Sequence, residues 1–180
     1  MSPRQAPSAF SLPAALSSAG YALRPETDGD VPFLMRLYAS TREDELALVG
    51  WSAAQKEAFL SSQFAAQRHH YRTALTGCCF AILEHDGAAV GRLYLQARQT
   101  QIHIVDIALL PACRNRGLGA AILRALQAAA AADGRSIGLM VATFNPALRL
   151  YRRLGFAAVA DHGPYCAMIW RPTPAQLNTA

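Results

Sequence analysis

Apolar residues in the first part of the chain predict one short strand followed by two helices. The stretch "YALRPET" alternates apolar and polar residues until Pro25, as is typical of a short strand. In "DGDVPFLMRLYAS" the apolar residues recur at helical spacing after an Asp/Gly start signal. A second helical pattern runs from Ser52, a candidate N-cap, to about Ala74.

The rest of the chain predicts mostly strands. Two apolar runs flank His85, Asp86 and Gly87 in "CCFAILEHDGAAVGRLYLQ", which indicates a hairpin. A further strand, "QIHIVDIALLP", is stopped by Pro111, and another is predicted at "SIGLMVATF". The last apolar stretch, "FAAVADHGPYCAMIW", predicts two strands around residues 162–164. With the helices between them, this order predicts an α/β domain with a mixed sheet.

Two helices in this part of the chain have start and stop signals. The predicted apolar side of the first comprises Leu118, Ile122, Leu126 and Ala129. Arg124 and Gln127 are expected to lie away from that side, and Gly134 suits the C-terminal turn. The second helix is predicted to open at Asn145, an N-cap candidate followed by Pro146 at the first helical position.

Length and composition indicate a single soluble domain. The 180 residues are 52% hydrophobic and 16% charged, and the chain is long enough to bury a proper core. We expect an irregular N-terminal extension over residues 1–20, the domain over 21–171 and a tail over 172–180. The net charge of +5 comes almost wholly from arginine, which suits a phosphate-bearing ligand, although a genome-wide composition bias explains it as well. No basic run interleaved with aromatic residues occurs, which argues against a nucleic-acid partner.

The cysteines and histidines give no sign of a disulfide framework or a metal site. The cysteines are Cys78, Cys79, Cys113 and Cys166. None stands in a CxxC spacing, which favours reduced thiols in a cytoplasmic protein. His69 and His70 have no cysteine or carboxylate at ligand spacing, so no metal is predicted. No stretch approaches the roughly 18 apolar residues of a membrane helix, so we expect no membrane association.

The stretch "CRNRGLGAAIL" places two glycines and two arginines where a strand turns into a helix. A helix start offers unpaired backbone N–H groups and the positive end of the macrodipole. Gly117 and Gly119 would let phosphate oxygens approach those groups, and Arg114 and Arg116 would add charged donors. The stretch lacks the GxGxxG of dinucleotide binders and the GK[ST] ending of a P-loop. By itself, the spacing fits a tight turn about as well as a ligand site.

Two linked segments resemble the GCN5-related N-acetyltransferase (GNAT) superfamily. The first, "IVDIALLPACRNRGLGAAIL", is similar to the family's fourth strand, its Q/R-x-x-G-x-G/A acetyl-CoA loop and the following helix. The second, "NPALRLYRRLGF", is similar to the family's stretch with L-Y-x-x-x-G-F. The loop positions are Arg114, Asn115, Arg116, Gly117, Leu118, Gly119 and Ala120. The resemblance implies a mixed, mostly antiparallel sheet of about six to seven strands, with splayed central parallel strands and about four helices.

The resemblance also implies an enzyme that transfers the acetyl group of its cosubstrate acetyl-CoA to an amine by direct attack on the thioester. Backbone at Leu109 and Leu110 would hold the thioester oxygen and pair with the pantetheine arm. Tyr151 matches the family's general acid for the CoA sulfur, and its other interpretation is a buried core aromatic. Asn145 matches a pantetheine contact, and a plain N-cap explains it as well.

The base that takes the amine proton stays open between two residues of the fourth strand. His103 matches the position that carries such a base in several relatives, and Asp106 matches the position at which polyamine-acetylating relatives carry an acidic residue. In a regular strand the two would point to opposite faces, unless a bulge intervenes. Met140 stands where relatives that acetylate ribosomal proteins carry a glutamate, so that route is absent. Proton removal through water, without a single base, is a further alternative.

The acceptor is expected to bind between the first two helices, their connection and the last hairpin. The candidates are Arg42, Glu43, Glu45, Trp51 and Tyr71, each of which also fits an ordinary surface or core role. Acidic residues there would favour a cationic amine, and Arg42 a carboxylate-bearing one. The leading hypothesis is a small amine, polyamine or amino-acid-like acceptor. The alternatives are a protein N-terminus, a lysine, an aminoacyl-tRNA, or a CoA-binding protein without catalysis. A homodimer is expected by family analogy alone.

Overall fold

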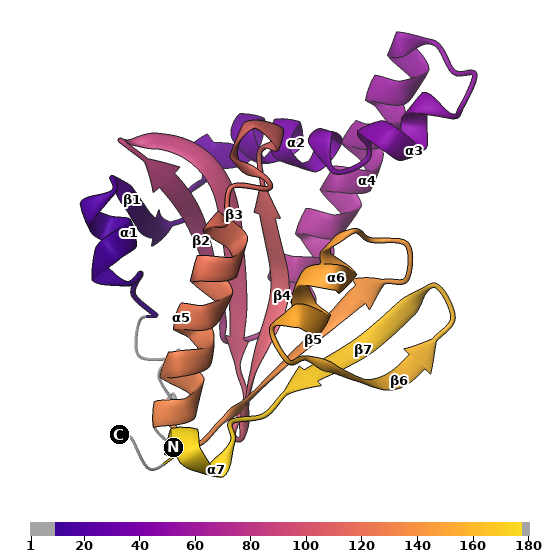
Figure 1. The fold of residues 1–180 in the computed structure, drawn as a ribbon. Helices are drawn as coiled ribbons and strands as arrows, with labels where there is room; N and C mark the ends of the chain where they lie inside the picture. The colour runs from indigo at the N-terminus through magenta and orange to yellow at the C-terminus, as the bar shows by residue number, and fades with distance from the viewer. Residues whose placement is uncertain (1–9, 178–180) are drawn as a thin grey trace.

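One seven-stranded sheet forms the centre of the molecule (Figure 1). The computed structural model describes residues 10–177, so residues 1–9 of the expected N-terminal extension lie outside the described residues. The strands are β1 (Tyr21–Pro25), β2 (Cys78–His85), β3 (Ala88–Ala97), β4 (Gln101–Leu109), β5 (Ser136–Ala142), β6 (Ala157–His162) and β7 (Tyr165–Trp170). Their spatial order is β1-β2-β3-β4-β5-β7-β6, and only β4 and β5 run parallel. The predicted mixed, mostly antiparallel sheet is confirmed.

The helices follow the predicted order, with short additions. They are α1 (Ala14–Ser18), α2 (Val31–Ser40), α3 (Glu43–Ala47), α4 (Ala53–Ala74), α5 (Leu118–Ala132), α6 (Ala147–Arg153) and α7 (Pro174–Leu177). The four that the sequence predicts are α2, α4, α5 and α6. The additions α1, α3 and α7 have at most five residues each, too short for a periodic pattern to show. Since α1 lies within residues 1–20, the described part of that extension is not wholly irregular.

Local signals account for where these elements begin and end. Helix α4 starts with a capping box, in which the Ser52 hydroxyl accepts the Gln55 N–H and the Gln55 side chain accepts the Ser52 N–H. The β2–β3 hairpin turns at Asp86 and Gly87, which both have positive φ angles, as a type I′ turn requires. The predicted boundaries at Ser52 and at this turn are therefore confirmed.

Helices cover the sheet on both faces (Figure 1). Helix α5 packs its buried side chains on one face, against β3, β4 and β5. Helices α2 and α4 lie on the other face, where Phe64 is the buried residue of α4 and joins the α2 residues Phe33, Leu34 and Leu37. The end of α4 that adjoins α3 projects beyond the sheet. Among the described residues, no helix is both long and apolar enough to cross a membrane.

The prediction of which residues form the buried side of α5 is partly wrong. Gln127, expected to point away from the core, is buried, and its side-chain amide donates to the Leu154 carbonyl at 2.7 Å. Ala129, expected on the apolar side, is exposed, and Ala130 is buried instead. The helix also packs against the turn after α6, so its buried side is wider than the apolar stripe alone. A long polar side chain can enter that side because it finds a backbone acceptor there.

Candidate active site

The parallel strands β4 and β5 separate halfway along their length. They pair only from Gln101 opposite Ser136 to Ile104 opposite Leu139, although both strands continue further. At the separation point β4 has a bulge: Ile104 and Asp106 oppose consecutive residues of β3, so Val105 has no partner there. A bulge bends the strand and ends the pairing locally. The splayed parallel strands expected from the sequence are therefore confirmed.

The separation leaves backbone groups of β4 free on the side of β5. The N–H of Leu110 donates to the Val90 carbonyl of β3 at 2.9 Å. Because successive N–H groups of a strand point to opposite sides, the N–H of Leu109 faces the opening. This is the orientation that an N–H donor to a thioester oxygen requires.

The bulge also decides which side chains share a face of β4. His103 lies opposite Gln96, and Asp106 lies opposite Tyr94, two residues away on β3. Residues directly opposite each other in an antiparallel pair lie on one face, and so do residues two apart along a strand. His103 and Asp106 therefore share the face of β4 toward α4. In a regular strand they would point to opposite faces, and the bulge brings them to the same one.

His103 lies in the paired half of β4, away from the opening. It pairs with Gly138 of β5, and six residues of strand, roughly 20 Å, separate it from Leu109. Burial, together with the nearby charge of Arg98, lowers the pKa of His103 to about 4. A neutral imidazole at this distance does not meet the geometry needed of a base at the thioester.

The lowered pKa predicts an effect of His103 on stability instead. In the unfolded chain an imidazole takes up its proton near pH 6.5, whereas in the folded chain it does so only near pH 4. The unfolded state binds more protons between these values, so stability falls as pH falls through this window. We expect His103→Gln to weaken this fall, as measured by urea unfolding at pH 7.5, 5.5 and 4.5. If the free energy of unfolding falls equally with pH in the wild-type protein and in His103→Gln, His103 is not the group responsible.

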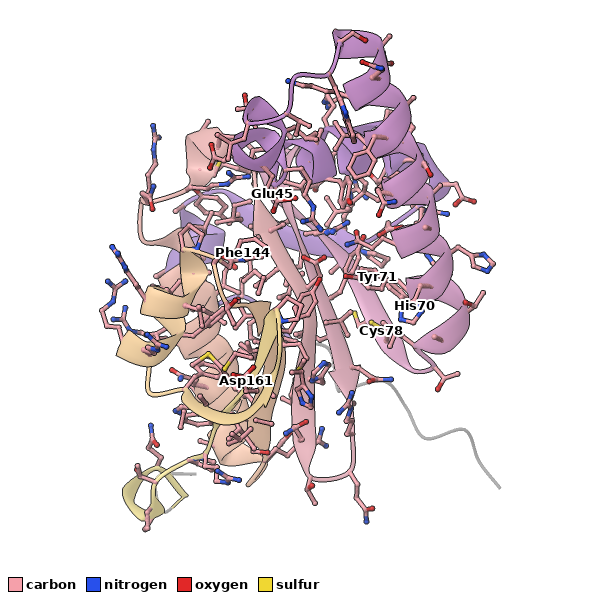
Figure 2. All side chains as sticks on the ribbon, turned by 90° about the vertical axis from the view of Figure 1, so that its right-hand side faces the viewer. Glu45, His70, Tyr71, Cys78, Phe144 and Asp161 are labelled. Atoms are coloured by element: carbon pink, nitrogen blue, oxygen red, sulfur yellow. The ribbon has the colours of Figure 1, made fainter. Side chains whose placement is uncertain are left out.

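Asp106 lies at the bulge, in the open half of β4. Its Oδ2 accepts Arg92 Nη2 at 2.5 Å and the Tyr71 hydroxyl at 3.2 Å. Arg92 is almost wholly buried, and its guanidinium also donates to Gln67 of α4 at 2.9 Å. Figure 2 shows Tyr71 on the sheet side of α4, where it also packs edge-on against Tyr94. Asp106 is thus held in one orientation by residues from β3 and α4.

Tyr151 of α6 is buried on the α5 side of the sheet. Its ring packs edge-on against Phe156, with centroids 5.6 Å apart. Burial, followed by the charge of Asp106, raises the pKa of Tyr151 to about 12. The hydroxyl therefore stays protonated at neutral pH and is able to donate. Tyr151 is thus a core aromatic, and its role as general acid stays a prediction.

The loop before α5 presents the start of that helix to solvent. Gly117 occupies the N-cap position with φ of 82°, and no side chain caps the first turn. A Cβ at Gly117 would meet no atom within 4 Å, so the space beside it is open. Asn115 also has a positive φ of 59°. The N–H groups of the first turn, which have no partner within the helix, and the helix dipole make this end suited to an anion.

The two arginines of the loop differ in role. Arg114 Nε donates to the Leu109 carbonyl at 2.8 Å, and its Nη2 donates to the Ser40 hydroxyl at 2.8 Å. Arg114 therefore ties the loop to the end of β4 and to α2, instead of reaching out for a ligand. Arg116 is exposed, so its side chain remains accessible to one. Leu118 is buried, and only its backbone is available.

Asn145 caps α6, as its residue type predicts. Its Oδ1 accepts the Ala147 N–H at 2.9 Å, and its carbonyl accepts the Leu148 N–H at 3.0 Å. The helix itself starts one residue later than expected, at Ala147, with Pro146 in the cap position.

Of the five acceptor-side candidates, Tyr71 contacts Asp106. The others lie on the connection between α2 and α4, which includes α3, and no contact joins them to Asp106. Arg42 pairs with Glu45 at 3.1 Å, Glu43 is exposed, and Trp51 packs against Phe59. Arg92 and Gln67, which hold Asp106 in place, were not predicted as site residues. The signal for Arg92 was a lone charge inside the apolar run "VGRLYL".

A comparison with protein families matches residues 76–158 to the acetyltransferase (GNAT) domain. This range contains β4, the loop before α5, and α6. The matched range is 83 of the 180 residues, and it supports the resemblance to the GNAT superfamily. Both sequence motifs that predicted the family lie within this range.

Solved GNAT structures share the fold. The PaiA N-acetyltransferase of Thermoplasma acidophilum, in complex with coenzyme A, has a TM-score of 0.64 at 15% identity, covering 84% of this chain and 99% of that one. YncA of Salmonella typhimurium, with acetyl-CoA, has a TM-score of 0.51 at 16% identity, covering 84% and 94%. RimL, a ribosomal L7/L12 alpha-N-protein acetyltransferase in complex with coenzyme A, has a TM-score of 0.57 at 15% identity, covering 89% and 97%. A search of curated proteins finds no match.

Proposed function

We propose that this protein transfers the acetyl group of acetyl-CoA to the primary amine of a small molecule. The arrangement at the β4 bulge carries the proposal. There, Asp106 lies in the open half of β4, between the Tyr71–Arg92 contacts on one face and Tyr151 on the other. A carboxylate on one face of the sheet, a protonated hydroxyl on the other and a free backbone N–H at the end of β4 supply the kinds of group that acyl transfer to an amine needs.

The residues before and along α5 fit acetyl-CoA, which supplies the activated acetyl group. The first-turn N–H groups of α5, with Gly117 and Gly119 leaving room, would hold the pyrophosphate. The backbone of Leu109, on the free edge of β4, would pair with the pantetheine arm, as a strand would. Leu110 is not available for this pairing, because its N–H donates to the Val90 carbonyl and its own carbonyl accepts the Cys113 N–H. The amide of Asn145 keeps its NH₂ group for the same arm, since its Oδ1 is used in capping α6.

Three groups divide the chemical work. The Leu109 N–H donates to the thioester oxygen as negative charge develops on it. The Tyr151 hydroxyl gives a proton to the leaving sulfur. An alkyl ammonium with a pKa near 10.4 must lose a proton before it attacks, and Asp106 attracts the ammonium and accepts that proton, directly or through water.

An acetyl-transfer screen with Asp106→Asn tests this proposal. Amines, polyamines, amino acids, lysine-containing peptides and peptide N-termini are offered, and both free thiol and acetylated product are followed. We expect transfer to a small amine. In Asp106→Asn, kcat/KM for that amine should fall about a hundredfold, because the amide cannot accept a proton. The dissociation constant for acetyl-CoA should stay unchanged.

The matched control is Asp133→Asn, which makes the same change at an exposed position beyond the far end of α5. It should keep full activity. If only peptides are acetylated, the acceptor is a macromolecule and the proposed small-molecule acceptor is wrong. Acetyl-CoA binding with no transfer at all would leave a CoA-binding protein without catalysis and contradict the proposal.

A further inference from the structure

Positive charge is concentrated in the segment that contains the proposed pyrophosphate site. Residues 107–160 contain seven arginines and one acidic residue, Asp133, and therefore carry a net charge of +6. Because the whole chain carries +5, the rest of the chain has a net charge of −1. Asp133 follows the far end of α5, so the segment has no acidic residue near the start of that helix.

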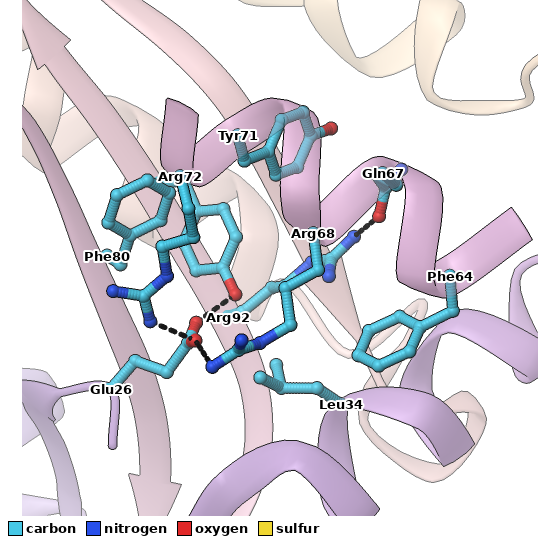
Figure 3. Close-up of a pocket in the computed structure, with 10 residues that line it drawn as sticks. Glu26, Leu34, Phe64, Gln67, Arg68, Tyr71, Arg72, Phe80 and Arg92 are labelled. Atoms are coloured by element: carbon cyan, nitrogen blue, oxygen red, sulfur yellow. Dashed lines mark hydrogen bonds and ion pairs between the residues drawn. The ribbon is translucent and has the colours of Figure 1, made fainter. Parts of the chain in front are cut away.

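The exposed arginines of this segment that matter here pair with no carboxylate among residues 10–177: Arg116, Arg149 and Arg153. Six other arginines in the same part of the chain do form ion pairs. Figure 3 shows two of them, Arg68 and Arg72, around the carboxylate of Glu26. The unpaired arginines therefore leave positive charge available to a ligand.

The positions of these arginines do not favour the fold by themselves. Arg116 directly precedes Gly117, the N-cap of α5, and Arg149 lies in the first turn of α6. A helix start is the positive end of the macrodipole, so a cation at either place is repelled by the helix. Arg149 and Arg153 are also four residues apart on α6, where like charges repel each other. A bound anion would offset both costs.

Helix α6 lies against the first turn of α5. A Cβ built on Gly119 would lie 3.8 Å from Cδ2 of Leu150. Because a helix turns by about 100° per residue, Arg153 and Arg149 lie about 60° and 100° around α6 from Leu150, on the same side. Arg152 lies about 160° away, nearly opposite Leu150. Arg149 and Arg153 therefore border the start of α5, whereas Arg152 faces away from it.

The order of groups in acetyl-CoA decides which anion this patch would meet. The thioester is followed by the pantetheine arm, the pyrophosphate and a ribose that carries a 3′-phosphate. With the thioester at Leu109 and the pyrophosphate at the start of α5, the 3′-phosphate is one ribose away from that helix start. A phosphomonoester has a charge of about −1.5 to −2 at pH 7. Guanidinium groups suit it, because their planar N–H donors match phosphate oxygens.

We propose that Arg149 and Arg153 bind the 3′-phosphate of acetyl-CoA, while Arg116 remains beside the pyrophosphate. The assignment rests on the position of acetyl-CoA proposed above. It gives α6 a second task besides presenting Tyr151, namely to select CoA esters over their 3′-dephospho forms.

Two ligands that differ only in this phosphate, CoA and 3′-dephospho-CoA, test the assignment in calorimetric titrations. The wild-type protein should bind CoA about tenfold more tightly, since each exposed ion pair contributes modestly. In the double variant Arg149→Gln, Arg153→Gln this ratio should fall to about one, and the dissociation constant for 3′-dephospho-CoA should stay unchanged. Arg152→Gln makes the same change on the far side of α6 and should keep the wild-type ratio.

The outcomes separate this assignment from the proposed function. Equal binding of the two ligands to the wild-type protein would overturn the 3′-phosphate site and leave CoA binding and acetyl transfer standing. Equal losses for both ligands in the double variant would also overturn it, because the arginines would then act on a group that both ligands share. No binding of either ligand would overturn both proposals. If the circular dichroism spectrum shows that the double variant does not fold, the single variants replace it, and each should lower the ratio.

Discussion

Replacing Gly117 with glutamate is expected to abolish measurable acetyl-CoA binding while the protein stays folded. The new carboxylate would occupy the open space at the start of α5 and repel the pyrophosphate that the first-turn N–H groups attract. We expect the dissociation constant to rise at least about a hundredfold, about 2.8 kcal/mol, in a calorimetric titration. Gly119→Glu should act in the same way, since a Cβ there meets only ordinary contacts, at 3.8 Å and beyond.

Gly134→Glu is the matched control for this result. Gly134 follows the other end of α5, has a φ of 63°, and has no atom within 4 Å of a built Cβ. A non-glycine residue at a positive φ costs roughly 1–2 kcal/mol at either position, so both variants should lose similar stability. Only the change at the start of the helix should affect binding. Undiminished binding in both Gly117→Glu and Gly119→Glu would contradict the pyrophosphate site.

Tyr151→Phe is expected to lower kcat for acetyl transfer about a hundredfold and leave acetyl-CoA affinity unchanged. The substitution removes the hydroxyl that gives a proton to the leaving sulfur, and general acid catalysis contributes at least about this much. The ring and its edge-on contact with Phe156 remain, so the fold should tolerate the change. Steady-state kinetics combined with a binding titration separate the two effects.

Tyr21→Phe serves as the comparison for that variant. Tyr21 lies on β1 at the far edge of the sheet, where it stacks on His85. This variant should turn over as fast as the natural protein. An unchanged kcat in Tyr151→Phe would remove this residue from the mechanism and leave it a core aromatic only.

Much of the fold could be predicted from the sequence, because its main elements carry their own signals. Ser52 and Gln55 begin α4 through contacts three residues apart, and Asp86 and Gly87 supply the positive φ angles of a tight turn. Such signals act within a few residues, so they need no knowledge of the rest of the chain. The short helices α1, α3 and α7 carry no comparable pattern.

The candidate site was predictable mainly where family motifs mark it. Gly117 and Tyr151 belong to such motifs, whereas Arg92 does not. Its role depends on Asp106 from β4 and Gln67 from α4, which pairing and packing bring together over 14 and 25 residues of chain. Likewise, the bulge at Val105 that sets the direction of Asp106 is visible only in the register of β3 against β4.

Gln127 shows that contacts with distant parts of the chain also limit prediction within a helix. Helical spacing alone places it outside the apolar stripe of α5, yet it is buried because the Leu154 carbonyl offers an acceptor there. Periodicity reports how apolar a position is. It does not report which backbone groups from elsewhere in the chain lie within reach.

The central claim is that groups at the separation of β4 and β5 pass an acetyl group from acetyl-CoA to an amine nitrogen. The most direct test quantifies free CoA thiol and acetylated amine in one reaction, with the acetylated atom located by NMR. We predict one amide for each thiol released, at a primary amine, and loss of both products together in Tyr151→Phe. Thiol release without a matching amide, or an acetyl group on any atom other than nitrogen, would contradict the claim.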